Sequence, residues 1–337
     1  MLKVVGCGIS KAILIWAFCV GGPVFAQKPA GLPGNYPSKP VKVIIGVAPG
    51  GGTDALTRLV FEGVRAGWDH PFIFENRTSA LGSAMALEYV SRAAADGYTL
   101  TSTAGSAYIG AAIVHKTPKN LLAVLDAIAQ FNSQVFLLVS STTLPAANVS
   151  ELVAHAMKNP GQLNYASAGI GSSAHLIGEY LKLMFGHLDI QHIPYKGMGV
   201  AYADLFKGRV QLAFATTASA LPHGKRGALR ILGITSAKRL DNLPDIPAIS
   251  ESLAGFEYVS FLGAVGPAGI PAPITTALNR QINEVLRQAE VKKALEAGGG
   301  LVTPNTPQFF QKTLEDFVQR NINLVRDAKL DLSGASE

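Results

Sequence analysis

Hydrophobic positions along the chain fall into short runs that alternate with helical patterns. Residues 41–48, 71–75 and 98–101 are apolar runs rich in β-branched and aromatic side chains, as in buried strands. Apolar residues at helical spacing follow the first two runs, at residues 56–64 and 82–94. This β-α-β-α-β order predicts a parallel α/β sheet.

The same alternation returns in the middle of the chain. The strands predicted there are residues 135–140, 163–168, 190–195, 210–215 and 229–235. A further apolar run at residues 261–265 returns the chain to the first sheet, and helical patterns follow from Ile274. We therefore expect an α/β fold with two lobes, each a mostly parallel sheet flanked by helices, that face a ligand cleft. The first lobe is predicted to comprise residues 36–130 and 256–330, and the second lobe residues 131–255.

The first 26 residues have the organisation of a secretory signal peptide. Lys3 and Lys11 accompany an apolar run at residues 12–25, and Val24 and Ala26 are the small residues that signal peptidase requires. The run is too short for a membrane anchor, so we expect cleavage after Ala26 and export to the periplasm. The alternatives are a buried N-terminal helix, which would need an amphipathic stripe, and a lipoprotein attached at Cys19.

Composition narrows the class of protein further. Both cysteines, Cys7 and Cys19, lie in the predicted signal, so the mature chain has no disulfide, thiolate metal site or cysteine nucleophile. Loss of Lys3 and Lys11 lowers the net charge from +6 to +4. The basic residues are scattered and no basic run interleaves with aromatic residues, which argues against nucleic-acid binding. The mild positive charge favours an anionic ligand.

The first candidate site is the segment Pro-Gly-Gly-Gly-Thr-Asp at residues 49–54, between a strand and a helix. Its glycines let the backbone approach a ligand, and the first N–H groups of the helix have no partner within it. Together with the helix dipole, these N–H groups attract a carboxylate. No Gly-Lys-Ser/Thr follows, so the segment is not a phosphate-binding P-loop. The alternative is a tight turn with Asp54 as the helix cap.

The second candidate is the segment Ser-Ala-Gly-Ile-Gly-Ser-Ser-Ala-His at residues 167–175, which also joins a strand to a helix. Gly169, Gly171 and Ala174 fit the dinucleotide fingerprint with Asp189 further on, so an exported NAD-dependent dehydrogenase is the enzyme alternative. Export removes the chain from nicotinamide cofactors, and Asp189 precedes the next strand instead of ending it. We therefore expect no cofactor.

A third candidate is the polar strand end at residues 101–106, whose hydroxyl groups can bind an acid or cap the next helix. Catalysis has little support because no His-Glu-x-x-His and no Gly-x-Ser-x-Gly motif occurs. Ser173 and His175 are two residues apart at a helix start, so their side chains diverge and a hydrolase is unsupported. We expect isolated, structural roles for His192 and His223.

Eleven short motifs occur in a characteristic order. They are YPSKP at residues 36–40, APGGGTD at 48–54, ENR at 75–77, DGYTL at 96–100, NPG at 159–161, LNYAS at 163–167, IPYKG at 193–197, ALPH at 220–223, TSAKR at 235–239, LPDIP at 243–247 and PAG at 267–269. In these motifs the chain resembles the tripartite tricarboxylate transporter receptors, or Bug family of periplasmic binding proteins. The resemblance covers nearly the whole mature chain.

The resemblance implies a type II periplasmic-binding-protein fold, the two-lobed "Venus flytrap", that closes on a small organic acid. It implies a monomeric receptor without enzyme activity, which hands its ligand to the membrane permease subunits of a tripartite tricarboxylate transporter. A sensor for a signalling receptor is the alternative. The expected ligand-binding residues are Val47, Pro49, Gly50, Gly51, Gly52, Thr53, Asp54, Thr103, Ala104, Ser106, Ala168, Gly169, Gly171, Ser172, Ser173 and His175, with no catalytic residue and no metal ligand.

The sequence departs from the family pattern near the expected ligand. Val47 stands where an aromatic residue is frequent, and Phe261 stands where tryptophan is common. Residues 78–82 replace the usual proline and glycine cluster, and residues 116–125 lack the usual Asp-Phe pair. The identity of the acid therefore stays open. Tyr108 and Phe261 are candidate linings for the distal end of the ligand, and for Phe261 we expect core packing as the main role.

Overall fold

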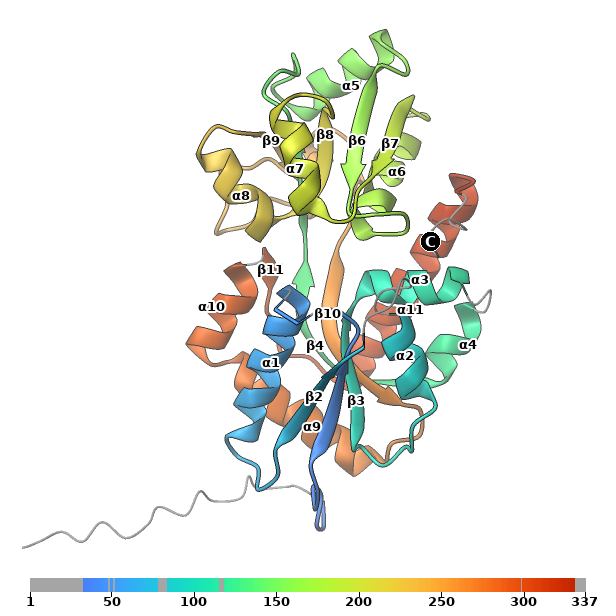
Figure 1. Ribbon diagram of the computed structural model, residues 1–337, viewed down its shortest axis with the longest axis vertical. Helices are drawn as coiled ribbons and strands as arrows, with labels where there is room; N and C mark the ends of the chain where they lie inside the picture. The colour runs from blue at the N-terminus through green and yellow to red at the C-terminus, as the bar shows by residue number, and fades with distance from the viewer. Residues whose placement is uncertain are drawn as a thin grey trace, which may run out of the picture.

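The computed structural model describes residues 33–47, 49–50, 52–77, 84–114, 118–297 and 299–330. The predicted signal peptide and Gly51 lie outside these ranges. Two mixed sheets lie one beyond the other along the long axis of the molecule, each with helices on both faces (Figure 1). Within the described ranges, no helix combines the length and the hydropathy needed to cross a membrane.

The first sheet has six strands. In spatial order they are β11 (Gly300–Leu301), β4 (Leu125–Gln134), β10 (Ser260–Pro267), β3 (Thr99–Ala104), β1 (Val41–Ile45) and β2 (Phe72–Asn76). One face packs against α1 (Gly52–Arg65), α9 (Ala272–Leu286) and α10 (Ala289–Ala297). The other face packs against α2 (Ala84–Ser91), α3 (Gly105–Val114) and α11 (Pro307–Asp327), and the short α4 (Pro118–Ala123) leads into β4.

The second sheet has five strands. In spatial order they are β7 (Ile190–Pro194), β6 (Leu163–Ser167), β8 (Leu212–Thr216), β5 (Phe136–Ser140) and β9 (Arg230–Ile234). One face packs against α5 (Val149–Lys158) and α6 (Ser173–Met184), and the other against α7 (Met198–Phe206) and α8 (Thr217–Lys225). A short 3-10 helix, η1 (Ile249–Glu251), follows β9.

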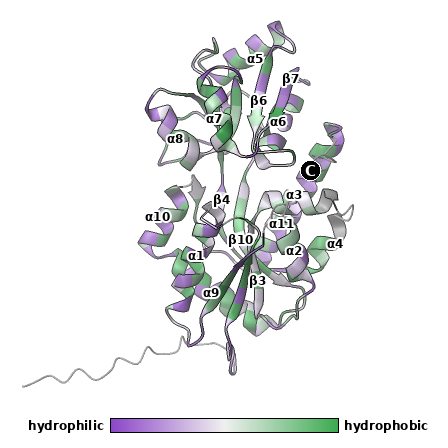
Figure 2. Ribbon diagram, viewed as in Figure 1, coloured by the Kyte–Doolittle hydropathy of each residue, from purple (hydrophilic) through white to green (hydrophobic). Residues whose placement is uncertain are grey.

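Successive side chains of a strand point to opposite faces of the sheet, so neighbouring residues of a central strand belong to different parts of the core. In β5, Leu137 and Val139 pack on the α7–α8 side, whereas Phe136 and Leu138 pack on the α5–α6 side. Because all five residues of β5 are buried, the strand appears in the sequence as a continuous apolar run. Figure 2 shows the resulting pattern, with apolar residues in the strands and hydrophilic residues on the outer helices. The predicted two-lobed α/β fold is confirmed.

The prediction of mostly parallel sheets is wrong in one respect, because both sheets are mixed. β1 pairs in parallel with β2 and β3, and β6 pairs in parallel with β7 and β8. β10 is antiparallel to β3 and β4, and β5 is antiparallel to β8 and β9. β4 leaves the first sheet and continues into β5 through Val135, and β10 brings the chain back from Ser260. β10 enters the first lobe and β5 enters the second, so each of these two strands runs against neighbours that point toward the other lobe.

The C-terminal helix α11 packs against both lobes. It contacts α3 of the first lobe and α6 of the second. Phe317 packs against Phe261 of β10, with ring centroids 5.2 Å apart. Four residues further along the helix, Asn321 accepts a hydrogen bond of 2.9 Å from the hydroxyl of Tyr258, just before β10. One continuous core therefore runs behind the two connections between the lobes.

Candidate functional site

The strand order places the strand-to-helix loops of both lobes at the ends of the sheets that face each other. β1, β2 and β3 run in the same direction as β4, which leaves for the second lobe. β6, β7 and β8 run opposite to β5, so their carboxyl ends point back toward the first lobe (Figure 1). The loops in question are residues 46–51, 104–105, 168–172, 195–197 and 216–217. Ligands of open α/β sheets bind at such carboxyl ends.

Asp54, in the first turn of α1, holds the β1–α1 loop in place. Its buried carboxylate accepts hydrogen bonds from the Gly50 N–H (2.9 Å), Asn76 Nδ2 (2.8 Å) and Arg58 Nε (3.0 Å). Asn76 Nδ2 also donates to the Val47 carbonyl (2.9 Å), which ties the start of the loop to the same carboxylate. Burial raises the pKa of Asp54, but the hydrogen bonds from Asn76, Gly50 and Arg58 outweigh it and hold the pKa below its usual range. The carboxylate is thus ionised and engaged with its own loop.

The backbone of this loop is open to approach. Gly50 has φ +80°, a conformation that favours glycine, and a Cβ at Gly50 or Gly52 would meet no atom within 4 Å. Pro49, Gly50 and Gly52 are exposed and Thr53 is half-buried. Because the first N–H groups of α1 have no acceptor within the helix, they are available to an anion from this side.

The polar end of β3 is largely engaged by its own neighbours. Thr101 Oγ1 donates to the Ile44 carbonyl (2.8 Å), and Thr57 Oγ1 donates to Ser102 Oγ (2.9 Å). Thr103 is 1% exposed, and its hydroxyl has no hydrogen-bond partner in the described part of the chain.

At the β3–α3 junction, Ala104 pairs with Leu262 of β10, and Ala104 and Ser106 are half-buried. The expected linings Tyr108 and Phe261 are 0% and 1% exposed and pack against each other with ring centroids 5.9 Å apart. They belong to the core because α3 turns Tyr108 inward against β10, so the lining predicted for Tyr108 is wrong and the core packing expected for Phe261 is confirmed.

The β6–α6 loop is closed by short-range hydrogen bonds. Ser172 caps α6 by accepting from the His175 N–H (3.3 Å), and its hydroxyl donates to the Gly169 carbonyl (2.7 Å). The Gly171 N–H donates to His175 Nδ1 (3.0 Å). Ala168 is exposed, and Gly169, Gly171, Ser172 and Ser173 are half-buried. The loop leaves the N–H groups of the first turn of α6, including that of Ser173, without an acceptor inside the helix.

A stack of rings supports this loop from the strand side. The ring of His175 lies on that of His192, with centroids 3.9 Å apart and planes at 13°, and His192 stacks in turn on Tyr165. Tyr165 donates to Glu179 Oε1 (2.7 Å), and His192 Nε2 lies 2.6 Å from Ser167 Oγ. The prediction that His192 is isolated is therefore wrong, because β7 lies beside β6 and brings His192 under the loop.

Both histidines are neutral at pH 7. Burial, followed by the charge of Lys182, lowers the pKa of His175 to about 4. Burial, followed by the neighbouring His175, lowers the pKa of His192 to about 4. Since His175 Nδ1 accepts from the Gly171 N–H, the proton of the neutral ring lies on Nε2. The loop therefore depends on an uncharged His175.

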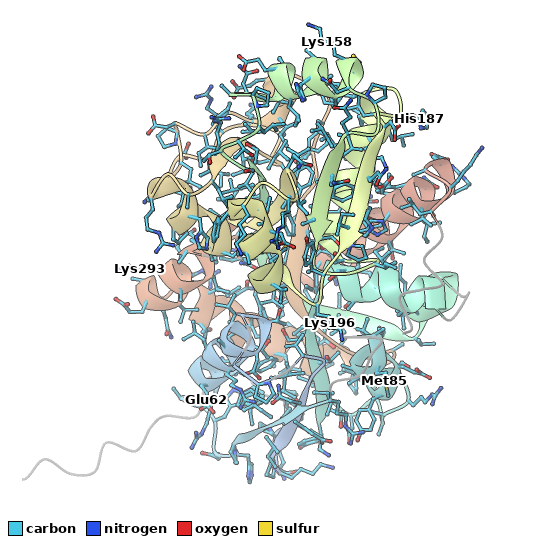
Figure 3. The ribbon with its side chains drawn as sticks, turned by 45° about the horizontal axis from the view of Figure 1, so that its top comes forward. Glu62, Met85, Lys158, His187, Lys196 and Lys293 are labelled. Atoms are coloured by element: carbon cyan, nitrogen blue, oxygen red, sulfur yellow. The ribbon has the colours of Figure 1, made fainter. Side chains whose placement is uncertain are left out.

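Sequence reasoning missed two further loops of the second lobe. In the β7–α7 loop, the Tyr195 N–H donates to the Ser167 carbonyl (3.1 Å), which sets this loop beside the β6–α6 loop. Lys196 is exposed there, and Figure 3 labels it where the second lobe faces the first. In the β8–α8 loop, Thr217 is 2% exposed and lies against Gly299 of the first lobe, where any Cβ would collide with it. The sequence did contain a signal that could have identified these two loops, because each one follows a predicted strand and precedes a helix.

The charge of these loops favours an anion. Residues 168–173, 195–197 and 216–217 contain no carboxylate and one cation, Lys196. In the first lobe, Asp54 is paired with Arg58. Backbone N–H groups of two helix starts and one lysine thus converge on the space between the lobes.

Comparison with known proteins identifies the family. The family model described as "Tripartite tricarboxylate transporter family receptor" matches residues 56–330. Protein BugT of Bordetella pertussis is 31% identical over 331 residues, which is 97% of each chain. The solved structure titled "R. palustris Rpa4515 with adipate" superposes with a TM-score of 0.75 at 27% identity, over 87% of this chain and 98% of that one.

The solved structure of MatC from Rhodopseudomonas palustris "with bound malate" superposes with a TM-score of 0.72 at 26% identity, over 86% of this chain and all of that one. The similar proteins are named as binding receptors and transport proteins, not as enzymes, which confirms the predicted class. The match over most of the chain also confirms the resemblance seen in the eleven motifs. The chain belongs to the tripartite tricarboxylate transporter receptor family.

Proposed function

We propose that this protein is a periplasmic receptor that captures a small organic acid between its lobes and delivers it to the membrane subunits of a tripartite tricarboxylate transporter. The observation that carries the proposal is the pair of glycine-rich strand-to-helix loops, residues 46–51 and 168–172, one at the facing end of each sheet. Family membership and the adipate and malate in two similar structures support a carboxylate as the ligand.

One carboxylate of the ligand would bridge the helix starts of α1 and α6. The first-turn N–H groups at Gly52, Thr53 and Ser173 would donate to it, with the hydroxyls of Thr53 and Ser173 as further donors. Asp54 and His175 would position the loops without contacting the ligand, because both are buried and the Asp54 carboxylate repels an anion. The lobes would hinge at Val135 and at the segment that precedes β10, where the chain passes between the sheets.

Such a ligand acts by contacting both lobes at once. It stabilises the closed arrangement over an open one only through the contacts that the closed form adds. Each lobe would contribute about half of the hydrogen-bond donors to the carboxylate. An open receptor would therefore keep only about half of these hydrogen bonds. The closed receptor is then the form that the transporter must recognise.

Isothermal titration calorimetry of the chain from Gln27 with malate, adipate and the neutral diamide of adipic acid tests the proposal. We expect binding of at least one acid and no binding of the diamide, since N–H donors and Lys196 select the charge. Gly52→Asp with Ser173→Asp should abolish acid binding by repulsion while each new carboxylate favours its helix start. Ala272→Asp, in the exposed first turn of α9, is the matched control. Unchanged affinity in the double variant would show that the site is misassigned.

A further inference from the structure

Helices α7 and α8 form one continuous face on the outer side of the second sheet. Tyr202 of α7 donates a hydrogen bond of 2.9 Å to Ser219 of α8. The ring of His223 lies 4.6 Å from that of Tyr202 and 5.0 Å from that of Phe206. The two helices are thus joined by a hydrogen bond and ring contacts and lie side by side in Figure 1. We call this surface the α7–α8 face.

The α7–α8 face exposes apolar side chains. Val200 is 59% exposed and Phe206 is 40% exposed, and both are among the large apolar side chains that stand out from the surface. Ala203, halfway between them, is also exposed, and so is Pro222 of α8. Residues 200, 203 and 206 follow one side of α7 at a spacing of three, so they form a stripe. Helix α7 is correspondingly among the more hydrophobic helices of the second lobe in Figure 2.

The same face carries most of the net positive charge of the chain. Residues 196–230 contain six Lys or Arg and one acidic residue; five of the cations and the acidic residue lie on this face, a net charge of +4 against +6 for the whole chain. The exposed cations are Lys196, Lys207, Arg209, Lys225 and Arg226, and the acidic residue is Asp204. Arg230 is the exception, because it donates to carbonyl groups on the other side of the lobe.

Among the described residues, one cation of this face forms an ion pair. Some cations of other helices pair along the helix, as in Lys312–Asp316 and Lys292–Glu296, whereas Lys158 and Lys293 do not within the described ranges. On the α7–α8 face, Asp204 pairs with Arg209 and accepts from Tyr195, while Arg226 donates to His223 Nδ1. Lys207 and Lys225 have no ion-pair partner in the described part of the chain. A partner that brings carboxylates would complete these pairs.

The position of the face links it to the ligand site. Helix α7 begins directly after the 195–197 loop, and α8 begins directly after Thr216. Both loops face the first lobe, and Thr217 at the start of α8 touches Gly299 of that lobe. A partner on this face therefore reaches the edge of the first lobe only when the lobes are close together.

We propose that the α7–α8 face docks an acidic, partly apolar extracytoplasmic segment of the membrane transporter, an inference that rests on the delivery role proposed above. A protein partner fits better than a lipid surface because the face combines a central aromatic cluster with arginines, the residue types that dominate protein interfaces. The apolar part is also short, since α7 has nine residues. Docking near the interlobe loops would make delivery depend on the closed form.

The test uses spheroplasts of the source organism that have been washed free of periplasmic proteins. Purified wild-type chain is added with ¹⁴C-labelled malate or adipate, whichever binds in calorimetry, and the rate of uptake is measured. The patch variant combines Lys207→Glu and Lys225→Glu. The control variant combines Lys158→Glu and Lys293→Glu, which are exposed, labelled in Figure 3 and change the charge equally.

We expect the patch variant to bind the acid with unchanged Kd but to lower the uptake rate at least about tenfold, because reversed charges repel the acidic partner. The control variant should stay within about twofold of wild type. Equal uptake with the two variants would overturn the docking proposal and leave the delivery role intact. If the wild-type chain binds none of the acids in calorimetry, the proposed function itself is wrong.

Sedimentation with phosphatidylglycerol vesicles separates a membrane from a protein as the partner. The proposal expects no difference between the patch and control variants in this assay. The outcome that would overturn the proposal is that wild type and the control variant sediment with the vesicles, the patch variant does not, and uptake is the same for all three. The face would then bind lipid.

Discussion

The stacked pair His175 and His192 should make this protein lose stability in mild acid. Both rings have a folded-state pKa of about 4, below the ordinary value of 6.5. Between these two values the unfolded chain binds protons that the folded chain does not, so the free energy of unfolding falls as the pH falls. The loss begins near pH 6.5 and is complete near pH 4, and at pH 5 it amounts to about 2 kcal/mol for one ring. Repulsion between the two protonated rings lowers the pKa of both but acts only once for the pair. The pair therefore contributes less than twice this loss of unfolding free energy.

The assay is urea unfolding of the chain at pH 7.0 and pH 5.0, for wild type and His192→Phe. Phenylalanine keeps an aromatic ring between Tyr165 and His175 but cannot be protonated. It should therefore shrink the difference in unfolding free energy between the two pH values by about 2 kcal/mol. His187→Asn is the control, because His187 is exposed and its φ of +63° suits asparagine.

Two results would refute this reasoning. A wild-type chain as stable at pH 5.0 as at pH 7.0 would mean that the rings are not buried in their neutral form. A His192→Phe chain that loses as much stability in acid as wild type would place the titrating group elsewhere. Ligand affinity, which depends on the folded chain, should hold at pH 5 and fall only as the pH approaches about 4, where protonated His175 can no longer accept from the Gly171 N–H.

Three further perturbations have defined outcomes. Asp54→Asn should lower the free energy of unfolding by about 2 kcal/mol and weaken acid binding, measured by urea unfolding and calorimetry, since it removes a charged acceptor from the β1–α1 loop. Gly299→Ala should push the lobes apart and raise the radius of gyration in X-ray scattering, because Gly299 has φ +79° and a Cβ there would collide with Thr217 of the other lobe. Adding Thr217→Ala to the same chain should reverse part of this change. Tyr258→Phe should cost about 1–2 kcal/mol of unfolding free energy by orphaning buried Asn321, without changing Kd.

The sequence predicted the strands that are buried on both faces. It missed β4, the strand that leads from the first lobe into the second. β5 is an apolar run because helices cover both of its faces. β4 carries polar residues such as Gln130 and Asn132, although Asn132 is 2% exposed. Its amide donates to the Leu295 carbonyl of α10, 163 residues away in the sequence. A local pattern contains no signal for a polar group that is satisfied by so distant a partner.

The candidate loops were also predictable, whereas the partners of their side chains were not. Glycines between a strand and a helix identify residues 49–54 and 167–175 as places where backbone can meet a ligand. The bond from Asn76 to Asp54 and the stacking of His192 under His175 depend on which strands are neighbours in the sheet. That order is a property of the fold and not of the local sequence.

These partners suggest how binding of acids survives wide sequence divergence. The polar side chains nearest the loops, Asp54 and His175, are used to hold backbone in position. The groups left facing the interlobe space are N–H groups of helix starts, which every residue except proline supplies. In the proposed site, receptors at 26% or 27% identity would therefore bind one carboxylate in the same way while the side chains around the rest of the ligand change. It follows that the preferred acid should be altered most readily by substitutions beside the loops, at positions such as Val47 and Lys196, and not by substitutions at the glycines.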